Sequence, residues 1–228
     1  MKAMILAAGR GERLRPLTDA VPKALVAVGG KPLVARHLER LAAAGFRDVV
    51  MNVSHLAEQV IAWLGDGSAF GLHISYSREE VPLETAGGLA RARALLGEAA
   101  FLLVNADVLC ELDFAPLRTR PLGTALAHLV LVPNPGHRAG GDFSLAAGRV
   151  GNDAAPRYTY AGIAVVSPAL FAGVESGTKA PLAPLLRAAA DRGQLSGELY
   201  EGLWRDVGTA ERLAEVEAMM VARNDARS

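Results

Sequence analysis

Short apolar runs alternate with amphipathic segments along the first half of the chain, and this alternation limits the possible folds more than any other feature. The runs 3–8, 48–53 and 100–107 have the length and composition of buried strands. Residues 32–45 and 56–65 place leucine and other apolar side chains at helical spacing. Strands that alternate with helices in this way usually run parallel, because each helix carries the chain back to the start of the next strand. The sequence therefore predicts an α/β fold with a mostly parallel sheet flanked by helices.

The second half of the chain is less regular. Strand patterns at 124–133 and 159–167 flank a stretch, residues 134–158, that is rich in Gly, Pro, Asn and Asp. A segment of this length with little regular structure usually carries a function or is mobile, so we expect a flap there. Two helical patterns follow, and no change of composition marks a linker. We therefore expect one domain, residues 1–228.

Composition and charge exclude several classes of protein. Lysine plus arginine equal aspartate plus glutamate at 24 each, so the basic excess of a duplex-binding protein is missing, and we expect no nucleic-acid partner. The start MKAMILAAG is too short for the core of a signal peptide, and no apolar run approaches the ~18 residues of a membrane span. The single cysteine, Cys110, has no partner for a disulfide within the chain. These features predict a cytoplasmic protein with no membrane association.

A stretch rich in glycine and arginine, LAAGRGERLRPLT at residues 6–18, follows the first strand directly. Loops in this position lie at the carboxyl edge of a parallel sheet, where such folds bind ligands. Gly9 and Gly11 allow a tight turn with N–H groups close to phosphate oxygens, and Arg13 can neutralise phosphate charge. The Walker motif is absent, and Leu14 stands where a dinucleotide fingerprint would need its third glycine. These residues alone leave a nucleoside triphosphate loop and a plain structural turn equally open.

Lys23 follows this loop in the segment VPKAL. The proline before it restricts the path of the backbone and therefore the reach of the ammonium group. The chain has only four lysines among its 24 basic residues. A lysine here rather than an arginine favours a compact charge placed against a phosphate. An ordinary solvated lysine is the alternative.

Four motifs in a fixed order connect these observations. LAAGRGERLRPLT with PKAL, PLETAGGLARA at 82–92, LLVNADV at 102–108 and WRDVGT at 204–209 together resemble the sugar-1-phosphate nucleotidyltransferase family. The resemblance extends over almost the whole chain. It implies a Rossmann-like, GT-A-like fold of the nucleotide-diphospho-sugar transferase type. It also implies the reaction of a nucleoside triphosphate with a sugar 1-phosphate, which gives a nucleoside diphosphate sugar and pyrophosphate.

The resemblance implies roles for particular residues. Asp107 and Asp206 are implied to bind Mg²⁺, which prefers carboxylate, phosphate and water oxygens. Without the resemblance, Asp107 would be interpreted as capping the turn after its strand. Asp206 would be interpreted as part of the capping of the next helix, for which Thr209 is suited. The remaining implied residues are catalytic Arg13 and Lys23, nucleotide-binding Ala8, Gly9, Gly11, Glu79, Thr85 and Gly88, and sugar-binding Gly141, Tyr160 and Gly162.

The nucleobase is expected to lie against residues 79–88. Thr85, Gly87 and Gly88 place backbone groups near its edge, and the helix that starts there is expected to offer free N–H groups. The carboxylate of Glu79 can accept a hydrogen bond from uracil N3–H, and it can equally accept from guanine N1–H and N2–H. Residue chemistry alone therefore leaves uridylyl and guanylyl transfer open.

Three segments favour one branch of the family. PLETAGG, NPGHRAGGDF at 134–143 and SGELYEG with LWRDVGT at 196–209 resemble the uridylyltransferases that use UTP and N-acetylmuramic acid 1-phosphate in cell-wall (peptidoglycan) recycling. Arg138 or Arg149 in the flap is expected to pair with the lactyl carboxylate of that sugar. The alternative is a mannose- or heptose-1-phosphate guanylyltransferase, whose PLGTAG motif has glycine where this chain has Glu84. A non-catalytic nucleotide-sugar sensor is the alternative of another class.

The five histidines show no spacing typical of a metal site, and with one cysteine a zinc centre is not expected. His37 lies within an apolar helical pattern. We therefore expect His37 in the core or half-exposed.

Overall fold

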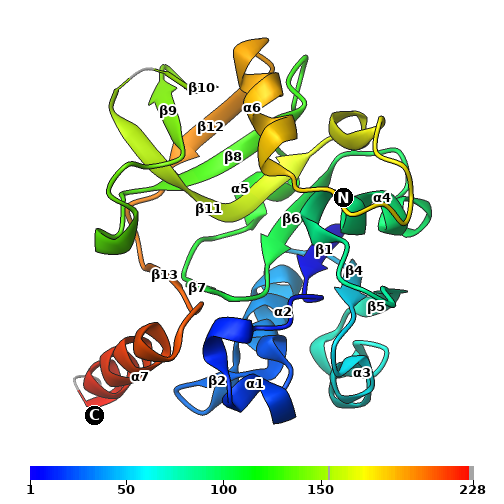
Figure 1. Cartoon of the computed structure of the whole chain (residues 1–228), viewed down its shortest axis with the longest axis vertical. Helices are drawn as coiled ribbons and strands as arrows, with labels where there is room; N and C mark the ends of the chain where they lie inside the picture. Colours follow the sequence, from blue (N-terminus) through cyan, green and yellow to red (C-terminus); the bar gives the residue numbers. More distant parts are fainter. Residues whose placement is uncertain (154, 226–228) are drawn as a thin grey trace.

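A sheet of nine strands organises the part of the chain that the computed structural model describes, residues 1–153 and 155–225. The strands lie in the order β5-β4-β1-β6-β11-β8-β12-β10-β9, and Figure 1 shows helices on both sides of them. Their bounds are Ala3–Leu6 for β1, Asp48–Val53 for β4, His73–Arg78 for β5, Phe101–Asn105 for β6, Ala127–Val132 for β8, Phe143–Ala146 for β9, Arg149–Gly151 for β10, Arg157–Val166 for β11 and Leu195–Leu199 for β12.

One half of the sheet is parallel and the other half is mixed. β5, β4, β1 and β6 run parallel to one another. β11 is antiparallel to both β6 and β8, β12 is parallel to β8, and β10 is antiparallel to β12. Between β8 and β11 the chain forms the β9–β10 hairpin instead of a crossover helix, so β11 returns antiparallel. The predicted α/β class is confirmed, but a mostly parallel sheet describes only the first four strands in the order.

The helices cover the two faces of the sheet separately. Their bounds are Leu17–Ala20 for α1, Leu33–Ala43 for α2, Ala57–Leu64 for α3, Glu84–Leu96 for α4, Ala115–Arg118 for α5, Ala183–Asp191 for α6 and Ala210–Asp225 for α7, with short 3-10 helices at Glu12–Leu14 (η1), Lys23–Leu25 (η2), Ser68–Phe70 (η3), Gly136–Arg138 (η4) and Pro168–Phe171 (η5). Side chains of α2, α3 and α5 pack against one face, and those of α4 and α6 pack against the other. No helix in the described ranges has both the length and the apolar character needed to cross a membrane.

The strands near the middle of the sheet are buried on both sides. Ile5 and Val104 belong to the core under α2 and α3, whereas Met4 and Leu103 belong to the core under α4 and α6. Successive side chains of a strand point to opposite faces, so a strand between two cores becomes apolar at every position. This explains why the runs at β1 and β6 are continuous in the sequence.

Two short ladders join the remaining strands. β2, Ala27–Val28, pairs with β3, Lys31–Pro32, and β7, Val108–Cys110, pairs with β13, Trp204–Asp206. A third apolar cluster connects β2 with α7. In Figure 1 the red helix α7 accordingly lies beside the blue N-terminal segment. The first and last parts of the described chain therefore meet.

Candidate active site

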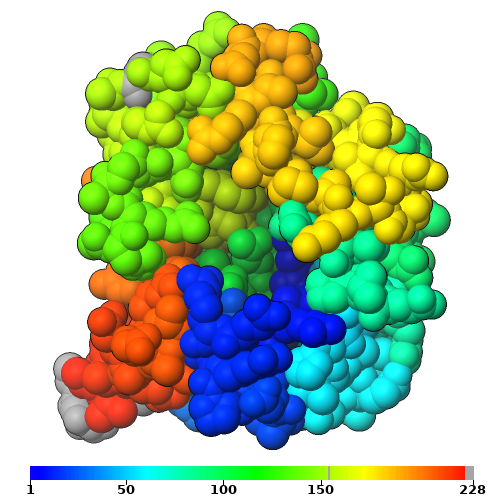
Figure 2. All heavy atoms as spheres, in the orientation of Figure 1, coloured from blue at the N-terminus to red at the C-terminus, as the bar shows by residue number. Residues whose placement is uncertain are grey.

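A cavity of about 910 Å³ opens at the carboxyl ends of the parallel strands. Its walls come from the loop after β1, the segment after β5, the first turn of α4 and the residues after β6. Figure 2 shows the surface hollowed near the middle of the molecule, where the blue N-terminal segment meets green and yellow parts of the chain. The cavity is lined by every residue predicted to be catalytic or nucleotide-binding except Gly88, namely Ala8, Gly9, Gly11, Arg13, Lys23, Glu79 and Thr85, and also by Asp107.

The loop after β1 leaves backbone donors free. Gly9 and Gly11 line the cavity, and their N–H groups donate no hydrogen bond within the described chain. Gly11 has a φ of 67°, which a residue without Cβ adopts easily, and its carbonyl accepts from the Leu14 N–H at 2.8 Å. A Cβ added to Gly9 would meet no atom within 4 Å. Free N–H groups beside open space are what a backbone loop needs to bind phosphate.

Lys23 and Asp107 form an ion pair at the wall of this cavity. Lys23 begins η2, Asp107 follows β6, and their side chains are 15% and 29% exposed. The pair keeps an ammonium group and a carboxylate at one point of the cavity. The first can bind a phosphate oxygen and the second can bind a divalent metal ion.

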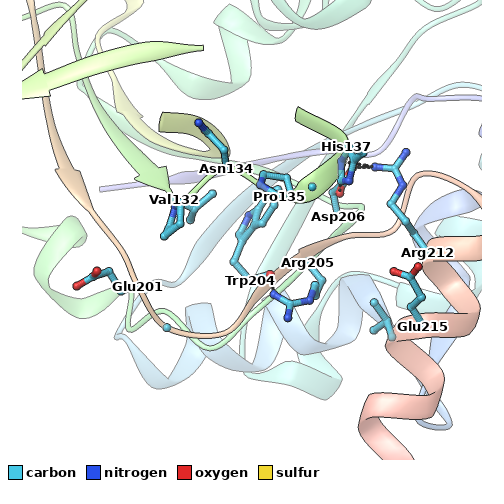
Figure 3. Close-up of a pocket in the computed structure, with 14 residues that line it drawn as sticks. Val132, Asn134, Pro135, His137, Glu201, Trp204, Arg205, Asp206, Arg212 and Glu215 are labelled. Atoms are coloured by element: carbon cyan, nitrogen blue, oxygen red, sulfur yellow. Dashed lines mark hydrogen bonds and ion pairs between the residues drawn. The ribbon is translucent and has the colours of Figure 1, made fainter. Parts of the chain in front are cut away.

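Asp206 reaches the same region from a distant part of the sequence. It stands opposite Val108 in the β7–β13 ladder, and the Val207 N–H donates to the Asp107 carbonyl at 2.8 Å. Its carboxylate, however, forms an ion pair with Arg212 of α7 and lines a second cavity of about 400 Å³, shown in Figure 3. The structure thus brings the backbones of the two predicted metal ligands together. Asp107 lines the larger cavity, and Asp206 lines the second one.

Glu79 is a buried carboxylate that connects the ends of three strands. Its Oε1 accepts from Nδ2 of Asn52 at 2.7 Å, and its Oε2 accepts from the Leu83 N–H at 2.8 Å. Oδ1 of Asn52 in turn accepts from the Ala7 N–H at 2.8 Å. A Cβ on Gly88 would lie 2.7 Å from Glu79 Oε1, so Gly88 is behind this network rather than at the cavity surface. Each carboxylate oxygen of Glu79 already accepts a hydrogen bond from the protein. That a remaining lone pair of Glu79 accepts a hydrogen bond from the nucleobase stays a prediction.

The first turn of α4 is covered by a remote segment. α4 begins at Glu84, and the N–H groups of Ala86 and Gly87 donate to the Ala180 carbonyl at 2.9 and 3.1 Å. The prediction that this helix start offers free N–H groups to the base is therefore wrong for these two residues. A Cβ on Gly87 would lie 2.3 Å from the carbonyl oxygen of Thr178, which shows how closely the two backbones approach. No local pattern signals this contact, because the partner segment is far away in the sequence.

Lys179 is a cavity residue that sequence reasoning missed. It lines the cavity, and its Nζ lies 3.3 Å from Oε1 of Glu84. Both side chains are largely exposed, so the pair contributes little to stability. Lysine is scarce in this sequence, and the scarcity that singles out Lys23 applies equally to Lys179.

The three residues predicted to bind the sugar line neither cavity. Gly162 lies in β11 against the side chain of Asn105, and Gly141 lies against the backbone of Arg157. The hydroxyl of Tyr160 is buried without a hydrogen-bond partner in the described chain, and burial raises the pKa of Tyr160. Their contact with a sugar stays a prediction.

Two carboxylates suit Mg²⁺ better than a metal that needs a full set of protein ligands. In the described ranges no group of three or more His, Cys, Asp or Glu side chains could hold a metal ion. Mg²⁺ usually binds one or two carboxylates and completes its shell with phosphate oxygens and water. Asp107 and Asp206 are therefore donors of the right kind, once the Asp206 carboxylate leaves its present partners.

Comparison with known proteins shows the family to which the chain belongs. Residues 2–127 match the model of the family described as nucleotidyl transferase. The chain is 48% identical over 230 residues to N-acetylmuramate alpha-1-phosphate uridylyltransferase of Neisseria meningitidis serogroup B, an alignment that covers 96% of this chain and 98% of that relative. It is 44% identical over 120 residues to mannose-1-phosphate guanyltransferase of Schizosaccharomyces pombe, which covers 51% of this chain but 33% of that relative.

The fold has solved counterparts. A Bacillus anthracis protein assigned as a glucose-1-phosphate thymidylyltransferase superposes with a TM-score of 0.85 over 96% of this chain and 95% of its own, at 21% identity. That identity establishes a common fold and nothing more specific. The family match covers more than half of the chain, and the Neisseria relative matches nearly its whole length. The chain therefore belongs to the nucleotidyl transferase family.

Proposed function

We propose that the protein transfers the uridylyl group of UTP to N-acetylmuramic acid 1-phosphate, giving UDP-N-acetylmuramic acid and pyrophosphate. The observation that carries the proposal is the 48% identity, over nearly the full length of both chains, to a relative named for this activity. The similarity to a mannose-1-phosphate guanyltransferase covers only a third of that relative. We place the reaction in the cytoplasm, in cell-wall recycling.

The chemistry requires two anions to meet. An oxygen of the sugar 1-phosphate attacks the α-phosphorus of UTP, and a new P–O bond forms as the bond to pyrophosphate breaks. No protein nucleophile is needed, so the protein aligns the reactants and neutralises charge. In the proposal the free N–H groups of Gly9 and Gly11 hold phosphate oxygens. Lys23 lies against the α-phosphate, and Arg13 neutralises charge on the departing pyrophosphate.

Asp107 and Asp206 would hold Mg²⁺, which when bound supplies positive charge between the phosphate groups. The positive charge of Lys23 and the negative charge of Asp107 neutralise each other in the present structure. When the ammonium group of Lys23 turns to a phosphate oxygen, the carboxylate of Asp107 becomes available as a metal ligand. The ion pair therefore keeps both groups in place before the substrate arrives.

We place the acceptor sugar between this cavity and the 134–158 flap of a single 1–228 domain. Arg138 is paired with Asp142 at 3.3 Å, and the guanidinium of Arg149 lies against Gly193, so neither lines the cavity. Lys179 does line it. Lys179 is accordingly the better candidate for pairing with the lactyl carboxylate of the muramyl group.

A pyrophosphate-release assay on the purified protein tests the substrates. UTP, GTP, dTTP and ATP are each combined with the 1-phosphates of N-acetylmuramic acid, N-acetylglucosamine, glucose, mannose and a heptose. UTP with N-acetylmuramic acid 1-phosphate should give the highest kcat/KM. A charge-assisted contact to the lactyl group contributes roughly 1.5–3 kcal/mol, so the advantage over N-acetylglucosamine 1-phosphate should be about ten- to a hundredfold.

Two other results would replace the proposal. A preference for GTP with mannose or heptose 1-phosphate would identify a guanylyltransferase. Binding of UTP by calorimetry without turnover of any sugar phosphate would identify a sensor.

Asp107→Asn tests the proposed metal site without changing the fold. The variant should lose turnover at saturating Mg²⁺, because loss of a metal ligand removes several kcal/mol of charge stabilisation in the transition state. Circular dichroism should show an unchanged fold. A near-normal kcat would remove Asp107 from the list of metal ligands.

A further inference from the structure

Both oxygens of the Asp206 carboxylate lie against side chains that do not line the larger cavity, which the proposal assigns to the nucleotide and which we call the nucleotide cavity. Oδ2 accepts a hydrogen bond from Nη1 of Arg212, and Oδ1 lies 3.3 Å from Nε2 of His137. Nη1 of Arg212 also lies 3.1 Å from the same His137 nitrogen. The three side chains come from β13, α7 and the 134–158 flap, and Figure 3 shows them grouped at one side of the second cavity.

The position of Arg212 is well defined. Its side chain is 15% exposed, and its backbone N–H donates to Oγ1 of Thr209 at 3.3 Å. A Cβ added to Gly208 would lie 3.1 Å from Nη2 of Arg212 and 3.1 Å from Nη2 of Arg13. Two guanidinium groups therefore flank Gly208, and only that of Arg212 pairs with Asp206.

We propose that Arg212 competes with the divalent metal for Asp206, so that metal binding transfers this carboxylate from Arg212 and His137 to an ion shared with Asp107. The inference rests on the proposed function, because it concerns the metal of that reaction. Arg212 forms an ion pair with Asp206, so an ion that takes Asp206 as a ligand meets a guanidinium group already in contact with that carboxylate. A guanidinium left on the carboxylate would also repel the ion.

The same exchange connects the metal to the flap. His137 belongs to η4 in the flap, and its contact with Asp206 ends when the carboxylate turns to the metal. Metal binding should therefore loosen residues 136–141. Residues 136–141 would then be able to adjust around the acceptor sugar, while β9 and β10 stay paired in the sheet.

Mn²⁺ binding to the protein without substrates tests the competition, with the free ion measured by electron paramagnetic resonance. Arg212→Ala should bind Mn²⁺ about tenfold more tightly than wild type, because a competing positive charge is gone. Arg212→Lys keeps the positive charge but loses the planar guanidinium group with its several N–H donors. Its Mn²⁺ affinity should lie between those of wild type and Arg212→Ala. Asp107→Asn and Asp206→Asn should both weaken binding strongly.

Arg205→Ala is the matched control. Arg205 precedes Asp206 and lines the same cavity, but its Nη1 donates to the Trp204 carbonyl at 2.7 Å. The variant removes the same charge without touching the Asp206 carboxylate, so its Mn²⁺ affinity should stay within about twofold of wild type. Thermal unfolding of each variant establishes that it is folded.

Hydrogen exchange gives a second readout that is independent of activity. Mn²⁺ should speed the exchange of amides 136–141 in wild type, and much less in His137→Ala, where the contact with Asp206 is already lost. Unchanged exchange in wild type would contradict the connection to the flap.

Several results would overturn the competition itself. An Arg212→Ala variant that binds Mn²⁺ as wild type does would show that Arg212 does not compete. Weaker binding would mean that Arg212 orients Asp206 for the metal, and equal binding by Asp107→Asn would place the ion elsewhere. None of these measurements uses UTP or a sugar. Tighter binding by Arg212→Ala together with failure of the substrate assay would therefore reject the proposed function and retain the competition.

Discussion

Two glycines, one behind the nucleotide cavity and one lining it, are needed for opposite reasons. A Cβ on Gly88 would lie 2.7 Å from Glu79 Oε1 and 2.9 Å from Asn52 Nδ2, both inside a buried network. A Cβ on Gly9 would meet nothing within 4 Å. Packing therefore requires the first glycine, whereas only a bound ligand would require the second.

Alanine at each position separates the two reasons. Gly88→Ala should lower the free energy of unfolding by about 1–3 kcal/mol, because the added methyl group displaces buried hydrogen-bonding groups. Gly9→Ala should leave that free energy unchanged or slightly higher but raise the KM for UTP by about tenfold, roughly 1.4 kcal/mol of binding. Urea unfolding and initial rates measure both. An unaltered KM in Gly9→Ala would mean that phosphate does not approach this backbone.

Arg13 and Lys23 are expected to act on the same phosphate charge. Arg13→Ala and Lys23→Ala should each reduce kcat/KM by about 10²–10³-fold. The double variant should lose less than the product of the two effects, because the residues act as a unit. Steady-state kinetics of the three variants measure this, and wild-type activity in either single variant would remove that residue from the catalytic list.

Residues that follow directly from a strand pattern are the ones that the sequence predicts well. Gly9 and Asp107 lie within three residues of the ends of β1 and β6, so their place at the carboxyl edge of the sheet follows from local pattern alone. Lys179 and Arg212 lie in segments whose neighbours are set by tertiary contacts, and no spacing points to them. Glu79 shows a third case, in which the residue was found but its bonds to Asn52 and Leu83 were not.

At the scale of elements, helix α2 carries a histidine into the core. His37 is 1% exposed, as the apolar pattern predicted, and its ring stacks on Phe114 with centroids 6.5 Å apart. Burial lowers the pKa of His37 from its ordinary 6.5 to about 4. Between these two values the unfolded chain binds a proton that the folded protein does not bind. The free energy of unfolding therefore falls as the pH decreases from 6.5 towards 4.

His37→Leu removes this contribution. Each pH unit is worth about 1.4 kcal/mol, so between pH 8 and pH 5 the stability of the variant should improve relative to wild type by about 2 kcal/mol. Urea unfolding of both proteins at the two pH values measures the change. A stability difference that does not depend on pH would show that folding does not lower the pKa of His37.

Elements with a clear local period were predictable, and those made by remote pairing were not. The strand predicted at 48–53 and the helix predicted at 56–65 agree with β4 and α3, because length and apolar period define them. The strand at 195–199 and the two-stranded ladder of β7 with β13 have too few residues for a period. Their hydrogen bonds to distant strands define them. For the same reason, the antiparallel return of β11 could not be derived from the sequence.

At the scale of the whole molecule, the nucleotide cavity draws on segments from most of the chain. UTP with Mg²⁺ should therefore stabilise the entire fold, by about 2.7 kcal/mol at a ligand concentration of 100 Kd. Asp107→Asn should keep the stabilisation that UTP gives in EDTA and lose the part that depends on Mg²⁺. Thermal unfolding with UTP, Mg²⁺ and EDTA in turn measures this. Equal Mg²⁺ effects in wild type and variant would place the ion outside the site.

The loop after β1 lies near β13 and α7 in the fold, but these segments are synthesised at very different times. Ribosomes add about 5–20 residues per second, so Gly9 is synthesised roughly ten to forty seconds before Asp206. During that interval the growing chain carries its phosphate loop but lacks the second carboxylate and the arginine beside it. On the proposed mechanism we expect turnover to begin only once β13 has paired with β7, so the growing chain should have no activity before that.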